Sequence, residues 1–152
     1  MPDPLSVHGP DRPRGLVLML HGGAEHSERP VDHRSLSLRR TQLMFAAIQS
    51  RVADAGCALG LLRFTVRGWN ARLGEPAPVA ALAGRQVVGA HGHRDRITSA
   101  RHTRSFLARA EEVAASTTFV DMGQAGHYML THVRSWNRTA LKASLGMLAG
   151  QL

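Results

Sequence analysis

The sequence contains one cysteine, Cys57, and no apolar run that approaches the ~18 residues typical of a membrane-spanning helix. A single cysteine excludes an internal disulfide framework and a zinc site built from several thiolates. The first fifteen residues lack the apolar core of a secretory signal peptide. We therefore expect a cytoplasmic protein without membrane contact, and 152 residues with 43% hydrophobic content predict one domain over 1–152.

Aromatic residues and lysine are also scarce. Aromatics make up 5% of the chain, and Lys142 is the only lysine among 19 basic residues, although the net charge is +8. Scattered arginines in an alanine- and glycine-rich chain are typical of GC-rich coding, and few aromatic rings are present to stack on bases. The composition therefore argues against nucleic acid, and an arginine-rich polyanion binder stays open as an alternative.

What the sequence does contain is an alternation of strand and helix patterns. Short apolar or β-branched segments predict strands at 16–20, 57–66, 86–92 and 117–122. Apolar stripes predict helices within 44–55, 106–114 and 130–148. Gly56 is placed to end the first helix, and Ser99 or Thr98 to begin the second. Such an alternation indicates an α/β fold with a mostly parallel sheet, and the alanine-, glycine- and proline-rich stretch 71–84 is typical of a linker.

Polar and glycine-rich segments follow each predicted strand, at the sheet edge where α/β proteins place their ligands. Asp95 follows the third strand and His127 the fourth, so the carboxylate could orient the imidazole and stabilise its protonated form. After the first strand, Gly22 and Gly23 allow backbone amides to approach an oxyanion closely. These residues predict an acid–base site.

Four segments in this order resemble the α/β-hydrolase superfamily, in particular its small actinobacterial esterase-like members. They are His21-Gly22-Gly23, Arg67-Gly68-Trp69-Asn70, Gly92-His93-Arg94-Asp95-Arg96-Ile97-Thr98 and Gly126-His127. The resemblance implies a three-layer sandwich in which Asp95 is the acid and His127 the base. It further implies an oxyanion loop, formed by His21, Gly22, Gly23 and Ala24, and no metal or other cofactor.

The chain departs from that family at the nucleophile. None of its ten serines lies in the G-x-S-x-G elbow, and Cys57 stands at the amino end of a strand, away from the functional edge. Only the 71–84 linker stands where the family has the elbow and its flanking strands. The resemblance thus implies a truncated sandwich of about four strands, in the order 2-1-3-4, with little or no hydrolytic activity.

As a hydrolase, the chain would act on a small ester-type substrate at most. Two further interpretations of the chain stay open. If the excised centre leaves bare strand edges, the chain is a non-catalytic module that forms homo-oligomers through them. The spacing of His91, His93 and Asp95 also echoes a zinc loop, although Arg96 follows where another histidine is usual. The prediction for metal is none.

Overall fold

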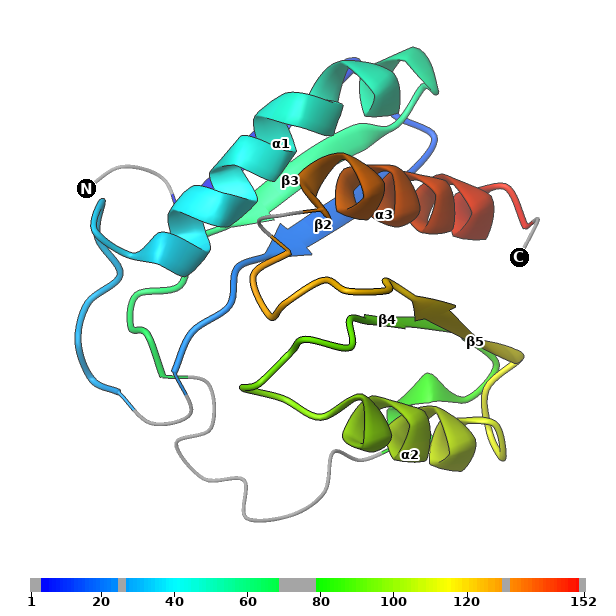
Figure 1. Cartoon of the computed structure of the whole chain (residues 1–152). Helices are drawn as coiled ribbons and strands as arrows, with labels where there is room; N and C mark the ends of the chain where they lie inside the picture. The colour runs from blue at the N-terminus through cyan, green and yellow to red at the C-terminus, as the bar shows by residue number, and fades with distance from the viewer. Residues whose placement is uncertain (1–3, 25–26, 69–78, 130–131, 151–152) are drawn as a thin grey trace. The chain divides into compact units, whose positions relative to one another are not determined.

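The computed structural model describes residues 4–24, 27–68, 79–129 and 132–150, which form a mixed α/β structure (Figure 1). The chain divides into two compact units, Met1–Leu73 and Gly74–Leu152. The boundary falls inside the predicted linker, of which residues 71–78 lie outside the described residues. The interpretation of 1–152 as one domain stays a prediction.

The first unit is a three-stranded sheet with one helix. Its strands are β1 (Leu5–His8), β2 (Leu16–Leu20) and β3 (Ala58–Leu62), in the order β1-β3-β2. β2 runs parallel to β3, and β1 runs antiparallel to it. The helix α1 (Leu36–Asp54) connects β2 to β3, as a parallel connection requires.

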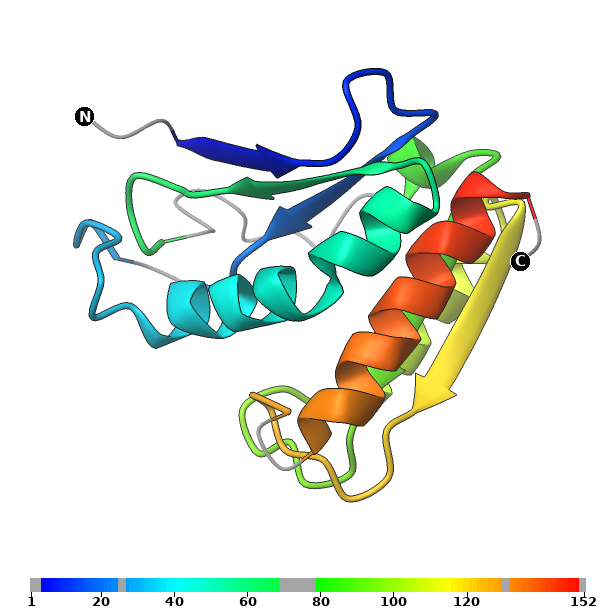
Figure 2. The same cartoon turned by 90° about the horizontal axis from the view of Figure 1, so that it is seen from above.

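Helix α1 covers one face of this sheet (Figure 2). Ile48 and Val52 of α1 are buried, as are Met19 of β2 and Leu59 of β3. Gly56 follows the helix with φ +71°, a left-handed conformation that glycine adopts at low cost, and confirms the predicted helix end. On the other face of β2, the leucines at 16, 18 and 20 remain 47–53% exposed.

The second unit has helices on both faces of two parallel strands, β4 (Gln86–His91) and β5 (Ser116–Asp121). On one face, α2 (Ala100–Ala110) packs its buried Leu107 over Gly89. On the other, Trp136 of α3 (Val133–Leu148) packs with Ala90 against the buried cluster of Met122, Ala125 and Met129. A short 3₁₀ turn, η1 (Ala80–Leu82), precedes β4. The side chain of Ser99 caps α2 by accepting a hydrogen bond from the amide of Arg101.

The predicted single, mostly parallel sheet of four strands is corrected by the structure. The strands form two sheets, each within one unit, and the sheet of the first unit is mixed. The mixed character comes from β1, which lies between Pro4 and Pro10, where no strand was predicted. Four residues are too few to show a periodic pattern, and β1 is held as an edge strand by ladder bonds to β3 and by the Arg63 amide, which donates to the Pro4 carbonyl.

Two element boundaries also differ from the predictions. Helix α1 begins at Leu36, eight residues before the predicted apolar stripe that starts at residue 44. Strand β3 ends at Leu62 rather than near residue 66, because the next residues bond to loops instead: the Phe64 amide bonds to a histidine ring, and Val66 bridges to Pro30. In the described part of the chain, no helix combines the length and the apolar character needed to cross a membrane.

Candidate active site

The turn after β4 is built around the carboxylate of Asp95. Its Oδ1 accepts hydrogen bonds from the amides of Ile97 at 2.9 Å and Thr98 at 2.8 Å. Its Oδ2 accepts from the hydroxyl of Thr98 at 2.7 Å. An aspartate that bonds its own backbone two and three residues ahead stabilises a local turn, so this short segment folds back on the carboxylate. The Asp95 side chain is only 4% exposed as a result.

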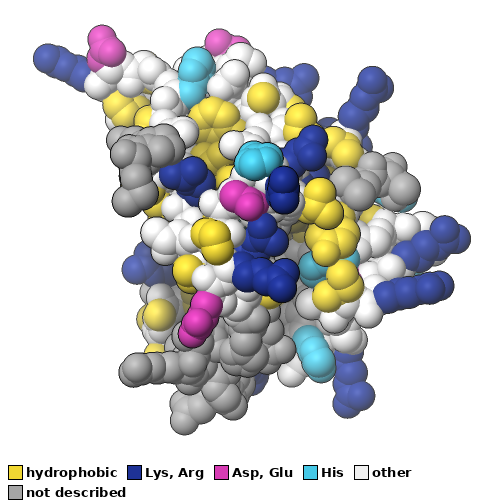
Figure 3. All heavy atoms as spheres, turned by 90° about the vertical axis from the view of Figure 1, so that its left-hand side faces the viewer, with side chains coloured by type: hydrophobic (Ala, Val, Ile, Leu, Met, Phe, Trp, Pro, Cys, Tyr) yellow, Lys and Arg dark blue, Asp and Glu magenta, His cyan; other side chains and the backbone are white. Residues whose placement is uncertain are grey.

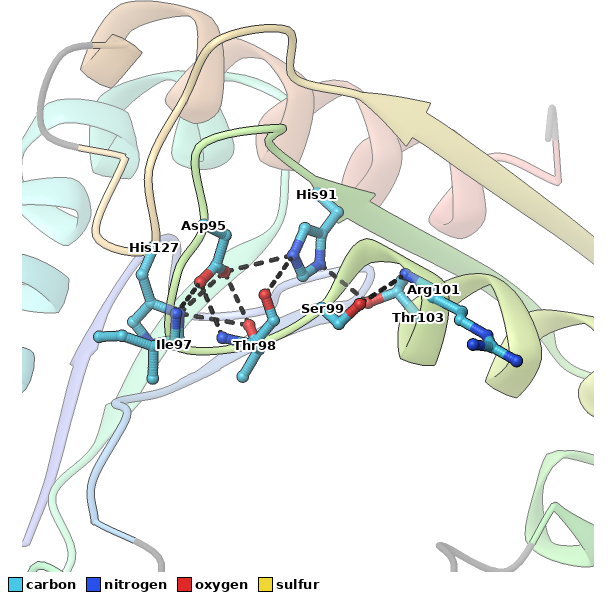
Figure 4. A network of polar contacts seen from close by, with 8 residues as sticks. All are labelled: His91, Asp95, Ile97, Thr98, Ser99, Arg101, Thr103 and His127. Atoms are coloured by element: carbon cyan, nitrogen blue, oxygen red, sulfur yellow. Dashed lines mark hydrogen bonds and ion pairs between the residues drawn. The ribbon is translucent and has the colours of Figure 1, made fainter.

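The turn after β5 brings His127 to the same carboxylate (Figure 4). The Nδ1 atom of His127 lies 2.9 Å from Oδ2 of Asp95, although the two residues are 32 positions apart. Two backbone hydrogen bonds join the turns: the His93 amide donates to the Gly123 carbonyl, and the Arg94 amide to the Ala125 carbonyl. The predicted acid and base therefore form a hydrogen-bonded pair at the carboxyl ends of β4 and β5.

Asp95 is held as a carboxylate. Burial raises its pKa, but the hydrogen bonds from the amide and hydroxyl of Thr98, from His127 and from the Ile97 amide outweigh burial and hold the pKa of Asp95 well below its usual range. A buried carboxylate surrounded by donors keeps its negative charge across the neutral range. It is therefore a fixed acceptor for the imidazole.

This geometry assigns the protons of His127. Asp95 offers an ionised oxygen to Nδ1, and the Thr98 hydroxyl, 3.3 Å from Nδ1, already donates its proton to Asp95. Both neighbours of Nδ1 thus act as acceptors, so Nδ1 carries the proton and Nε2 has a free lone pair in the neutral ring. No partner for Nε2 occurs among the described residues, and the side chain is 35% exposed. His127 is arranged to accept a proton at Nε2.

The predicted oxyanion loop lies in the first unit, after β2. His21 is 1% exposed, and its Nε2 accepts a hydrogen bond from the Phe64 amide at 3.1 Å. Its Nδ1 therefore carries the proton and donates to the Gly22 carbonyl at 2.8 Å. Both ring nitrogens are used, so His21 shapes the loop and is not available as an acid or base.

Ala24, the last residue of that loop, has its amide in use. The amide donates to the Arg67 carbonyl at 2.8 Å and forms a bridge between Ala24 and Gly68. An amide bonded in this way cannot also stabilise an oxyanion, which leaves the Gly22 and Gly23 amides as the candidate donors. The related prediction at Trp69 and Asn70 lies outside the described residues.

Among the described residues, no serine or cysteine nucleophile accompanies the pair. All ten serines are described, and none bonds to His127. Ser99 is committed to the cap of α2, and Cys57 is fully buried with its thiol 3.6 Å from the Ala55 carbonyl. The pair can therefore act only on water or on a hydroxyl supplied from outside the described residues.

The zinc interpretation finds no geometric basis here. The His93 ring lies 2.9 Å from the Asp121 carboxylate, and both side chains are about half exposed. The Gly123 amide and His93 lower the pKa of Asp121 by hydrogen bonding to its carboxylate. Across the parts of the chain that the structure describes, no three His, Cys, Asp or Glu side chains are grouped to hold a metal ion.

Sequence reasoning considered His91 only as a zinc ligand and Thr98 only as a helix cap, whereas the structure places both beside Asp95. The Asp-x-x-Thr spacing from 95 to 98 was an available signal for Thr98, because it is typical of a turn that bonds back to an aspartate. No sequence pattern indicates this role for His91, since its partners come from a turn and a helix.

The basic side chains seen in Figure 3 are interspersed with apolar, acidic and histidine side chains, so this view adds no support for polyanion binding.

Comparison of the chain with family models, with curated proteins and with solved structures found no match.

Proposed function

We propose that this chain belongs to the acyl-hydrolase lineage of the α/β-hydrolase superfamily, with Asp95 as the acid and His127 as the base of its site. One observation carries the proposal: the 2.9 Å contact between Nδ1 of His127 and the buried carboxylate of Asp95. Both residues follow parallel strands, the location that the family resemblance predicts for them.

The chemistry of this pair is general base catalysis. Nε2 of His127 takes a proton from water while the water oxygen attacks the acyl carbon of a small ester. Asp95 holds the ring in the required tautomer and stabilises the imidazolium that forms. The tetrahedral adduct then expels its alkoxide or phenolate, and the imidazolium returns its proton to that group or to solvent.

The expected activity is very low. A serine hydrolase forms a covalent acyl-enzyme, and this step needs a hydroxyl within hydrogen-bond distance of Nε2, which the serines of this chain do not supply. Water that is not held in place loses much of the gain that a positioned nucleophile provides. The expected substrate is at most an activated small ester. We therefore propose descent from the acyl-hydrolase lineage, and not an efficient activity.

The three-layer α/β arrangement of that superfamily is part of this proposal. It is supported by two observations: β2–β3 and β4–β5 are both parallel pairs, and a helix joins the two strands of each pair.

Hydrolysis of p-nitrophenyl acetate tests the function. We expect the unaltered chain to exceed the rate of buffer slightly, and His127→Ala to return it to the rate of buffer, because the catalytic lone pair is gone. His102→Ala, which removes an exposed histidine of α2, is the matched control for imidazole content and should keep the rate of the unaltered chain. Equal rates for all three chains would show that His127 takes no part in catalysis.

A further inference from the structure

His91, the last residue of β4, is a buried histidine that the acid–base mechanism above does not use. Its side chain is 7% exposed. Nε2 lies 3.2 Å from the Thr98 carbonyl and 3.3 Å from Oδ2 of Asp95. Nδ1 lies 2.9 Å from the hydroxyl of Thr103 on α2. From the end of β4, the ring thus contacts both the Asp95 turn and helix α2 (Figure 4).

The protons on this ring follow from its partners. The Thr98 carbonyl oxygen can only accept, so Nε2 of His91 carries a proton and donates it to Thr98, while the Asp95 carboxylate lies 3.3 Å away. In the neutral ring, Nδ1 then accepts from the Thr103 hydroxyl. Both ring nitrogens of this buried side chain form hydrogen bonds, so the ring is held in one orientation.

The same carboxylate oxygen lies close to both histidines. Oδ2 of Asp95 lies 3.3 Å from Nε2 of His91 and 2.9 Å from Nδ1 of His127. The Thr98 carbonyl to which His91 donates belongs to the residue whose amide and hydroxyl hold Asp95. His91 therefore acts on the carboxylate through its hydrogen bond to the turn that surrounds it.

We propose that His91 is a positioning residue: its Nε2–H binds the Thr98 carbonyl and holds the 95–98 turn so that the Asp95 carboxylate meets Nδ1 of His127. This inference rests on the proposed function of the pair. His91 touches no reacting atom, and its effect is to hold His127 in the Nδ1–H tautomer. The hydrogen bond between Thr103 and Nδ1 of His91 fixes the ring to α2, the helix that packs on β4 and β5.

The test is ¹⁵N NMR of His127 in histidine-labelled chain at mildly basic pH, where the two tautomers give distinct nitrogen signals. We expect Nδ1–H in the unaltered chain. His91→Leu removes the donor and should shift most of the His127 population to Nε2–H. His91→Gln keeps an N–H donor for Thr98 and an acceptor for Thr103, and should retain Nδ1–H.

A second variant covers the case in which His91→Leu does not fold. Thr103→Val keeps the shape of Thr103 but removes the hydroxyl, so His91 loses its anchor, and we expect a partial shift toward Nε2–H. An unchanged Nδ1–H signal in the folded His91→Leu chain, or in Thr103→Val when only that variant folds, overturns the positioning role. By contrast, Nε2–H in the unaltered chain contradicts the proposed function itself.

Discussion

Replacing Gly92 with alanine is expected to lower the free energy of unfolding by about 3 kcal/mol, the cost of forcing an extra group into a closed contact. Gly92 follows β4 directly and packs on the turn after β5. A Cβ at this position would lie 2.7 Å from the carbonyl carbon of Ala125 and 2.8 Å from its Cβ. The obstructing atoms include backbone, so the clash cannot be relieved by a rotamer change.

The clash at Gly92 also separates the acid from the base. The turns that carry Asp95 and His127 are joined beside Gly92 by the bonds from His93 to Gly123 and from Arg94 to Ala125. Moving them apart lengthens the 2.9 Å contact of the pair. We therefore expect Gly92→Ala to lose stability and the His127-dependent rate together.

Urea unfolding followed by circular dichroism measures the effect. The matched control is Gly126→Ala in the facing turn, where a Cβ would meet only the Arg94 carbonyl oxygen at 3.7 Å, an ordinary contact distance. The control should stay within about 0.5 kcal/mol of the unaltered chain. Comparable stability of the two variants would contradict the close approach of the two turns.

Replacing Asp95 with asparagine is expected to lower stability by about 2 kcal/mol at neutral pH, because hydrogen bonds to a buried charge are lost. The amide oxygen can still accept from the amides of Ile97 and Thr98. The amide nitrogen, however, faces the Thr98 hydroxyl and Nδ1 of His127, which both donate to Asp95 in the unaltered chain. At least one donor is then left without an acceptor.

The same substitution should flatten the acid side of the stability profile. The pKa of Asp95 is lower in the folded chain than the ~3.9 of an unfolded aspartate. Its stabilisation is therefore complete above about pH 4 and is lost as pH falls, because the unfolded chain takes up a proton before the folded chain does. Asparagine takes up no proton, so this contribution disappears.

Unfolding free energies at pH 5 and pH 3 in urea measure the difference. The unaltered chain should lose more stability over this interval than Asp95→Asn. Asp11→Asn, which removes an exposed carboxylate in the first unit, is the control and should behave like the unaltered chain. Parallel pH profiles for the unaltered chain and Asp95→Asn would rule out the strongly bonded carboxylate.

Much of the local structure could be predicted because it depends on neighbouring residues. The apolar run Leu16–Leu20 and the β-branched run after residue 115 both form strands, and Gly56 and Ser99 end and begin their helices. Apolar periodicity and helix-capping residues can both be recognised within a short stretch of sequence. Strand partners depend on residues that are distant in the sequence. The four predicted strands are therefore present, while the prediction that they form a single sheet was wrong.

The site shows the same division. Asp95 and His127 were predictable because each directly follows a strand, and parallel neighbours end at one edge of a sheet. The use of the Ala24 amide by Arg67 and the contact of His91 with Thr98 were not. These bonds depend on how a loop or ring turns after the chain has folded, which neither spacing nor propensity encodes.

The tautomer of His127 tests the central claim most directly. In Asp95→Asn the amide nitrogen offers a proton to Nδ1, so the ring should switch to Nε2–H and lose the lone pair that accepts the substrate-side proton. We expect ¹⁵N NMR to show Nδ1–H in the unaltered chain and Nε2–H in Asp95→Asn. The same tautomer in both chains would contradict an acid–base pair formed by Asp95 and His127.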